Sequence, residues 1–392
     1  MISADKRREI LFLGIFALMC LILMLLPTGF DRAIYFNAMG SKAKVVSTND
    51  SMMHHSGILY IGEQLCTVNI LSGPHSGETY EAINMLSGKL EFDKVFVEGD
   101  VAWVLLEQDE RGDVIFSTMV DHYRITKEIQ LIALFALVLI LFSGLTGIRT
   151  IFSFVFAILA IWKILIPFAL KGYEPIVIAL VVGNLLTIVT LLLVAGCTQK
   201  AFAAILGSVF CSLLTCLLAV FFTRYLDVHG SVMQWSESLL YAGYMNLDLT
   251  KIFQAAVYLS CCGAILDLAI DISAALDEVR KAKPDVTFQA LVKSGITIGR
   301  SVVGSQTTTL LLAYIGSYLT VMMVYMAQGT PMMSIFNSKS VASEILHTFV
   351  GCSGLVLVSP LTSLVCGWIY TYDKQKIKLP SRKKTALSFE EN

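Results

Sequence analysis

Eight runs of apolar residues, each about as long as a bilayer is thick, constrain this chain more than any other feature. A helix needs about 20 mostly apolar residues to cross the hydrocarbon core of a membrane. Only 15% of the 392 residues are charged, whereas a soluble domain carries about 25%. The chain is therefore predicted to be a polytopic α-helical membrane protein with about eight transmembrane helices. The predicted spans lie near residues 10–27, 129–148, 150–170, 174–196, 201–223, 251–276, 300–327 and 345–371.

The first run follows the basic segment Lys6–Arg8 and therefore admits two interpretations. A secretory signal peptide has an apolar core of about 7–15 residues and a small-residue cleavage site after it. Here the apolar core extends from Ile10 to Leu26, and no such cleavage site follows. We expect residues 1–30 to form an uncleaved membrane anchor rather than a signal peptide.

Lys and Arg are unequally divided between the two predicted sides of the membrane. If the N-terminus is inside, the short outer loops hold only Lys171, Arg224 and Lys339. Cytoplasmic loops of membrane proteins carry an excess of Lys and Arg. Both termini, including the basic tail 373–392, are therefore predicted to be cytoplasmic. The basic residues of the cytoplasmic segments before the tail are Lys6, Arg7, Arg8, Arg149, Lys200, Arg280, Lys281, Lys283, Lys293 and Arg300.

Residues 31–127 form the one long polar segment, between the first two predicted helices. The β-rich sequences GILYIGEQLCTVNIL, LEFDKVFVEGDVAWVLLEQ and DVIFSTMVDHY are separated by turn-forming SGPHSGE, EGD and DERGD. About five short strands predict a small all-β barrel or sandwich, of the oligonucleotide/oligosaccharide-binding (OB) type. This domain is expected outside the membrane, followed by a seven-helix membrane domain over residues 128–372.

Several functional classes lack support in the sequence. Charges of both signs are mixed in the outer segment, which argues against nucleic-acid binding. A metal site among His54, His55, His75 and His122 is the less favoured alternative to solvated loop histidines. Of nine Cys, only Cys66 lies in this segment and no CxxC pair occurs, so neither a disulfide nor a zinc site is expected. We expect no enzymatic activity and no cofactor, because the sequence contains no recognisable nucleophile–base pair or metal motif.

The strongest functional candidates are two acidic residues in the sixth run. Asp267 and Asp271 are four residues apart and therefore share one helix face. Along a helix, Asp267 lies about 24 Å from Lys251 and about 15 Å from Asp277, slightly cytoplasmic of the bilayer centre. Ionisable groups are costly in hydrocarbon. Asp267 is therefore expected to turn inward to polar groups and to exchange protons; the alternative is a permanent hydrogen bond to a neighbouring helix.

A second polar group lies in the seventh run, at nearly the depth of Asp267. It comprises Gln306, Thr307, Thr308 and Thr309, and it begins about 9 Å beyond Arg300. An amide and three hydroxyls facing carboxyl groups would form a polar relay for protons or ions. The alternative is that these side chains only hydrogen-bond between helices.

Three glycines and a lysine complete the set of candidates. Gly263, Gly299 and Gly304 are expected to permit close helix packing. Lys163, in the third run, is long enough to reach toward Asp267 and pair with it. Extension of its ammonium group to the outer lipid headgroups costs less free energy than pairing with Asp267, and we prefer this interpretation.

The connection between the sixth and seventh runs has helical spacing on both sides of Pro284. Residues 288–292 carry an apolar stripe that predicts a short helix on the cytoplasmic membrane surface. A solvated connector is the alternative. Three other polar residues, Asn184, Glu344 and His347, receive no assigned role, and Glu344 is expected at the membrane interface.

Three segments, GAILDLAIDISAALDEV, GRSVVGSQTTTLLLAYIGSYL and GCSGLVLVSPLTSLVCGWIY, carry a family resemblance. The chain resembles the YibE/F family of bacterial membrane proteins over most of its length. The resemblance implies an N-terminal anchor, a small outer β domain ending VDHYR and a multi-helix region in the bacterial cytoplasmic membrane. It implies no established biochemical activity.

A more distant similarity bears on mechanism. The order Gly263-x-x-x-Asp267, a basic connector and a helix with a Thr-Thr pair is similar to SecD/SecF subunits of the RND superfamily, which are proton-driven. By that similarity Asp267 matches a membrane-embedded acid, and Thr307 to Thr309 match the polar patch of the next helix. The chain departs from the pattern in having about two more helices and a much smaller outer domain. Asp271 has no certain counterpart.

These observations lead to two functional hypotheses. The first is a secondary transporter or proton-driven accessory protein that uses Asp267 and Asp271 as protonatable acids. The second is a non-transporting scaffold that presents the outer β domain to envelope proteins. The expected partners are the lipid bilayer and either a second copy of the chain or another envelope protein, with no nucleic acid.

Overall fold

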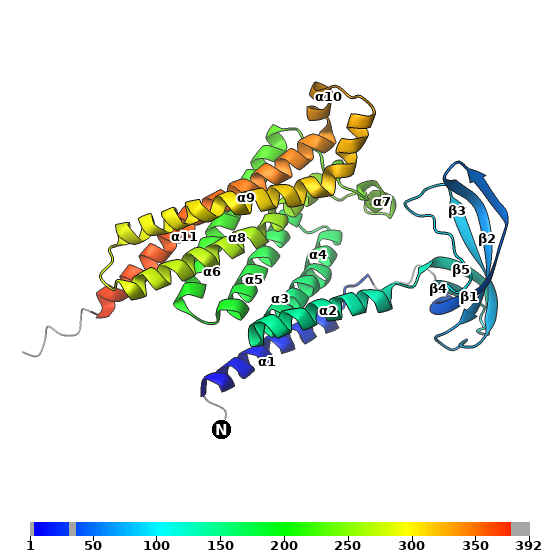
Figure 1. Ribbon diagram of the computed structural model, residues 1–392, viewed down its shortest axis with the longest axis horizontal. Helices are drawn as coiled ribbons and strands as arrows, with labels where there is room; N and C mark the ends of the chain where they lie inside the picture. Colours follow the sequence, from blue (N-terminus) through cyan, green and yellow to red (C-terminus); the bar gives the residue numbers. More distant parts are fainter. Residues whose placement is uncertain (1–3, 31–36, 378–392) are drawn as a thin grey trace, which may run out of the picture. The chain divides into compact units, whose positions relative to one another are not determined.

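The chain divides into two compact units (Figure 1). The computed structural model describes residues 4–30 and 37–377, with only the backbone described for 4–12 and 372–377. One unit, Asp31–Phe142, contains a β-barrel and the helix that follows it. The other combines Met1–Phe30 with Ser143–Asn392 and contains the remaining helices.

Five strands form a closed barrel with the order β1-β2-β3-β5-β4. Neighbouring strands are antiparallel, except that β3 and β5 pair in parallel. Alternate residues point inward along each strand, as in β2, where Gln64, Cys66, Val68 and Ile70 are buried. The predicted small β-barrel is confirmed. The strands are β1 Ala38–Ser56, β2 Leu59–Ile70, β3 Thr79–Ser87, β4 Val101–Gln108 and β5 Val114–His122.

The side chain of Gln64 replaces a strand partner for the segment between β3 and β4. Its Nε2 donates to the carbonyl of Phe96 at 2.8 Å, and its Oε1 accepts from the Phe96 N–H at 3.0 Å. Nδ2 of Asn84 donates both to Gln64 Oε1 and to the carbonyl of Lys94, at 3.1 and 2.6 Å. Because a buried backbone group without a partner is costly, these two amides stabilise a segment that no strand pairs with.

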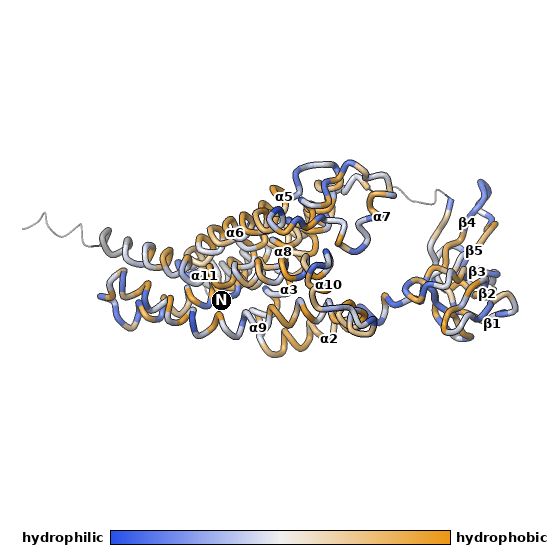
Figure 2. The backbone as a smooth tube through the Cα atoms, turned by 90° about the horizontal axis from the view of Figure 1, so that it is seen from above, coloured by the Kyte–Doolittle hydropathy of each residue, from blue (hydrophilic) through white to orange (hydrophobic). Residues whose placement is uncertain are grey.

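Seven helices are long and apolar enough to cross a membrane, and all of them follow the barrel. Figure 2 shows hydrophobic residues along the middle of the helices in the unit that combines Met1–Phe30 with Ser143–Asn392. The prediction of a polytopic helical protein surrounded by a lipid bilayer is therefore confirmed. The seven are α2 Ile125–Ser143, the continuous series α3 Leu145–Ala160, η1 Ile161–Leu165 and α4 Ile166–Leu170, then α5 Pro175–Ala195, α6 Gln199–Tyr225, α8 Leu249–Ala282, α9 Phe288–Ala327 and α11 Lys339–Ile377. Short helices η2 Gly230–Val232, α7 Ser236–Tyr241 and α10 Met332–Phe336 lie in the connections.

The first predicted span differs from the other seven. Helix α1, Ala4–Leu25, precedes the barrel, but the apolar part of it with described side chains, Leu13–Leu25, is shorter than the others. The prediction that the barrel lies between the first two spanning helices is corrected, because all seven helices of spanning length follow the barrel.

Helix α9 begins earlier than predicted. It starts at Phe288 and continues for 40 residues, and the Thr287 side chain caps it by accepting from the N–H of Ala290 at 3.3 Å. No proline interrupts the chain between this cap and Ala327. Residues 288–292 are therefore the first turns of α9, and form neither a separate surface helix nor a solvated connector.

Helix α11 packs closely against α6, α8 and α9 through small residues (Figure 1). A Cβ atom added at Gly354 of α11 would lie 2.6 Å from Thr215 Oγ1 of α6. On α9, Gly299 lies directly against the side chain of Ser359. A buried apolar cluster that includes Ile265 of α8 fills the space between these helices. Helix α3 packs on α5, and α1 packs on α3.

Replacement of Gln64 by Leu is expected to destabilise the barrel by about 3 kcal/mol, because the N–H and C=O of Phe96 lose their buried partner. Hydrogen–deuterium exchange of the segment between β3 and β4, measured in the full chain, should become faster. The control is Asn69→Leu, which removes an amide whose hydrogen bond lies at the surface. Equal exchange in the two variants would contradict the role of Gln64.

Candidate functional site

One face of α8 is buried and the opposite face is uncovered. Ser260, Gly263, Asp267 and Asp271 follow one another at three- or four-residue spacing, and all four are exposed. We call these four residues the α8 stripe. This orientation differs from the expectation that Asp267 turns inward against neighbouring helices. The residues buried on the opposite face include Cys261, Ile265, Leu268, Ala269, Ile272, Ser273 and Leu276.

Asp267 and Asp271 have no hydrogen-bond or ion-pair partner among the described residues. By contrast, Asp277 on the same helix lies 3.3 Å from Arg280 and 2.9 Å from Lys281. The helical rise places Asp267 about 27 Å from the start of α8 and about 22 Å from its end. A carboxylate at this depth is too costly to leave in contact with lipid. The α8 stripe therefore requires water or protein beside it in the membrane.

The polar group of α9 is divided between two faces. Gln306 and Thr307 are half-buried, and Oε1 of Gln306 and Oγ1 of Thr307 lack a described hydrogen-bond partner. Thr308 and Thr309 are exposed, and their hydroxyls donate to carbonyls of their own helix at 3.1 and 3.0 Å. No hydrogen bond between described residues joins this group to Asp267. The two polar groups lie on adjacent helices without the expected direct link.

The three candidate packing glycines have different surroundings. Gly299 contacts Ser359 of α11, as the spacing of small residues led us to expect. Around Gly263 and Gly304 no atom lies within 4 Å of an added Cβ, so neither glycine packs against another helix of the chain. Both face the open side of their helices.

Lys163 lies in the π-helical turn η1 and donates to the carbonyl of Leu26 at 3.1 Å. Pro167 has no N–H to give the carbonyl four residues before it, which accounts for the wider turn. The ammonium group of Lys163 thus holds the chain just beyond the end of α1 against the continuous series α3–η1–α4. It does not pair with Asp267.

A hydrogen-bonded cluster that the sequence did not reveal lies where α8, α9 and α11 meet. Nε2 of His347 is 2.5 Å from Oγ of Ser260, and the hydroxyl of Tyr314 donates to the same Oγ at 3.2 Å. The rings of Tyr314 and His347 are 4.4 Å apart between centroids. Since Ser260 also belongs to the α8 stripe, this cluster and Asp267 share one helix face. We call Ser260, Tyr314 and His347 the histidine cluster.

Next to the histidine cluster, Glu344 of α11 and Tyr318 of α9 line a cavity of about 170 Å³. Oε1 of Glu344 and the hydroxyl of Tyr318 are buried and make no hydrogen bond to a described residue. Thr348 is the other polar residue of the lining, and the rest is apolar. Glu344 is therefore a half-buried residue that lines this cavity, five residues after the start of α11.

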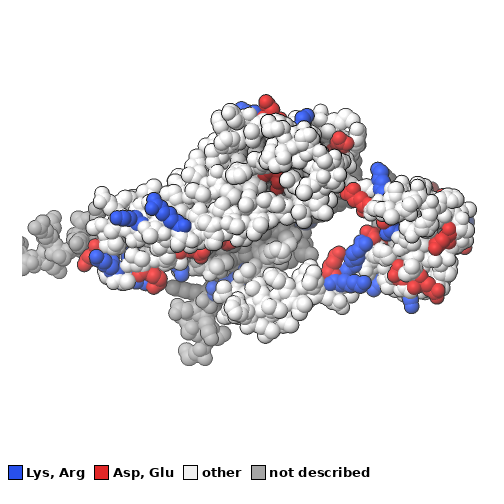
Figure 3. All heavy atoms as spheres, turned by 45° about the horizontal axis from the view of Figure 1, so that its top comes forward, with Lys and Arg blue, Asp and Glu red and all other residues white. Residues whose placement is uncertain are grey.

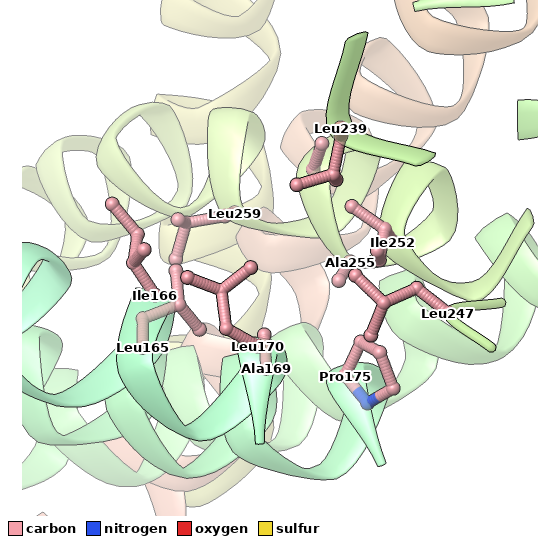
Figure 4. A pocket seen from close by; sticks show the side chains of 11 residues that line it. Leu165, Ile166, Ala169, Leu170, Pro175, Leu239, Leu247, Ile252, Ala255 and Leu259 are labelled. Carbon is pink, nitrogen blue, oxygen red and sulfur yellow. The ribbon is translucent and has the colours of Figure 1, made fainter. Parts of the chain in front are cut away.

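An apolar recess of about 370 Å³ lies between α4, α5, α7 and α8 (Figure 4). Its lining is aliphatic throughout, with Leu170, Leu239 and Leu259 from three of the helices. Such a lining suits a lipid acyl chain and offers no group for catalysis. Figure 3 shows few charged side chains over the flank of the helical unit in that view.

The histidines of the barrel occupy separate places. His75 Nδ1 lies 2.9 Å from Glu78 Oε2, and Tyr80 donates to the same carboxylate oxygen. This hydrogen bond raises the pKa of Tyr80 to about 12 and, together with His75, lowers the pKa of Glu78. His122 lies beside the ring of Phe96, with centroids 4.6 Å apart. Within 4–30 and 37–377, no group of three His, Cys, Asp or Glu side chains is arranged to bind a metal.

A family model described as YibE/F-like protein matches residues 131–372, more than half of the chain. The chain belongs to the YibE/F-like protein family. The matched region contains the α8 stripe, the histidine cluster and Glu344, whereas the barrel lies outside it. Neither the curated proteins nor the solved structures gave a match. The comparisons give no support to a relation with SecD/SecF.

Replacement of Asp267 by Asn in this YibE/F-like protein should change the free energy of unfolding by no more than about 0.5 kcal/mol, since no partner is lost. Asp277→Asn, which removes contacts to Arg280 and Lys281, should cost about 2 kcal/mol. Thermal unfolding of the two variants in lipid nanodiscs measures the difference. An equal loss of stability would identify Asp267 as a structural residue.

Proposed function

We propose that this YibE/F-like protein is a proton-coupled transporter, or a proton-driven accessory protein, in which Asp267 and Asp271 bind and release protons. One observation carries the proposal: two carboxyl groups lie on one open helix face, near mid-span, with no partner among the described residues. A carboxyl group fixed in an ion pair resists protonation. A carboxyl group that only water or a mobile partner approaches is free to change its protonation state.

The same proposal includes the topology. The distribution of Lys and Arg supports a cytoplasmic C-terminus and a barrel on the outer side. The closed five-stranded order of the barrel supports the OB type. The sequence similarity to SecD/SecF subunits motivates proton coupling, but it rests on short motifs in α8 and α9.

Proton uptake by reconstituted protein tests the proposal. Proteoliposomes that contain a trapped pH-sensitive dye receive a potassium diffusion potential, negative inside. Wild-type protein should take up protons, and Asp267→Asn should reduce the rate at least about tenfold because its amide cannot carry a proton. The control is Glu237→Gln, an exposed acid on the short helix α7 and away from α8. Wild-type rates in Asp267→Asn would refute the proposal.

A second candidate function, a scaffold for envelope partners, is supported by an apolar surface on the barrel. Met52 of β1 and Met85 of β3 both pair with Glu63 of β2, so all three share one face of the sheet. Ile61 lies on the same face, two residues along β2. Met52, Ile61 and Met85 are 55%, 47% and 62% exposed. Exposed apolar side chains around a single carboxylate, that of Glu63, are typical of a protein-binding surface.

Crosslinking in intact cells separates the scaffold from the transporter. The double variant Met52→Glu, Ile61→Glu should lose the crosslinked partners of the wild-type chain, while its proton uptake in proteoliposomes stays unchanged. Ile115→Glu is the control, because Ile115 is 70% exposed on β5. Identical crosslinks in all three proteins would exclude this surface as a partner site.

A further inference from the structure

The histidine cluster joins three helices at the end of the α8 stripe. Ser260 lies about 16 Å from the start of α8, and His347 about 12 Å from the start of α11. These helix ends are the outer ones in the proposed topology. From Ser260 the stripe continues inward through Gly263 to Asp267. Protonatable and hydrogen-bonding groups therefore follow one another from the outer third of the membrane to its middle.

We propose that Glu344, His347 and Ser260 form the outer half of a proton pathway that ends at Asp267. This inference rests on the proposed function and adds to it the side from which Asp267 receives its proton. It also assigns roles to residues that the sequence left without one.

The first step of the pathway is from Glu344 to His347. The two residues are three positions apart on α11 and therefore lie on one side of the helix. Oε1 of Glu344 is buried and makes no hydrogen bond to a described residue, and such atoms are the ones that ordered water satisfies. A water molecule bound to this oxygen would carry a proton along the same side of α11 toward the His347 ring.

The second step passes through Ser260. The protonated Nε2 of His347 gives its proton to Oγ of Ser260, and Ser260 releases its own proton to the open face of α8. His347 becomes neutral, Ser260 is unchanged, and the carboxylate that finally accepts the proton becomes neutral. Tyr314 donates to Oγ of Ser260 and so holds the oxygen in place. The Ser260 hydroxyl otherwise donates to the carbonyl of Val257, at 2.9 Å.

The third step runs along the stripe from Ser260 to Asp267. Two helical turns, about 10 Å, separate these residues. Gly263 lies between them, and no atom comes within 4 Å of the place where its side chain would begin. About three water molecules in sequence span this distance at ordinary hydrogen-bond lengths. The missing side chain at Gly263 leaves the space for them.

The surroundings of His347 leave its charge free to change. The titratable groups that face the histidine cluster are Tyr314 from α9, Cys261 from α8, and Glu344 and Cys352 from α11 itself. No Lys or Arg in the described part of the chain forms an ion pair with Glu344 or His347. Histidine is the side chain whose charge ordinarily changes between about pH 5 and 8.

The test compares five full-length proteins in the proteoliposome assay, with protons themselves as the probe: wild type, Asp267→Asn, His347→Gln, Gly263→Leu and Gly14→Leu. Glutamine keeps a hydrogen bond to Ser260 but does not exchange a proton in this range. A Cβ atom at position 263 has no described atom within 4 Å, and the rest of a leucine side chain would extend into the space along the stripe. Gly14 of α1 is the matched control, an equally open helical glycine away from the pathway.

His347→Gln and Gly263→Leu are expected to lower the rate of proton uptake at least about tenfold, to the level of Asp267→Asn. Gly14→Leu should keep the wild-type rate, and Gly263→Leu should keep the wild-type melting temperature. The dependence of uptake on outer pH between about 5 and 8 should disappear in His347→Gln, which a purely structural role would not explain.

If His347→Gln and Gly263→Leu retain wild-type uptake while Asp267→Asn does not, the pathway is wrong and the proposed function stands. If Asp267→Asn also retains wild-type uptake, both the pathway and the proposed function are wrong. Should His347→Gln lose stability, Gly263→Leu still decides the question, because its substitution removes no contact.

Discussion

The close approach of α11 to three other helices determines the arrangement of the whole helical unit. Helices in lipid gain little from the hydrophobic effect and associate through van der Waals packing and hydrogen bonds. Here glycines of one helix meet serines or threonines of the next, as at Gly299 with Ser359 and Gly354 with Thr215. Apolar residues of α8, such as Ile265 and Ile272, pack between these helices, so that the apolar side of α8 is buried and its carboxyl groups lie on the opposite side. The same contacts bring His347 of α11 to the side of Ser260.

Periodicity in the sequence predicted the parts of the fold that depend on local pattern. Apolar runs predicted the spanning helices, and alternation between turn residues predicted the barrel strands. The start of α9 was missed because its first residues read equally well as a surface helix. Helical spacing showed that Asp267 and Asp271 share a face, but which face of a helix is buried depends on its neighbours. The histidine cluster could not be predicted, since its members are 54 and 87 positions apart in the chain and meet only when three helices pack.

The family match and the division into units separate two functional questions. The matched region, 131–372, contains every residue of the proposed proton pathway. The barrel has its own buried core, which includes Val45, Val68 and Leu106, and its own buried amide pair. A role for the barrel in recruiting partners is therefore compatible with a role for the helices in moving protons.

The length of α9 has a mechanical consequence. Forty residues of unbroken helix extend about 60 Å, about twice the thickness of the hydrocarbon core. The backbone hydrogen bonds of α9 continue from the Phe288 end to the region of Tyr314, so a displacement at one end is carried along the helix. Over half of this length, about 30 Å, a rotation of about 5° displaces the end by about 3 Å, comparable to the length of one hydrogen bond. A movement at the Phe288 end would therefore be large enough to change the contacts of Tyr314.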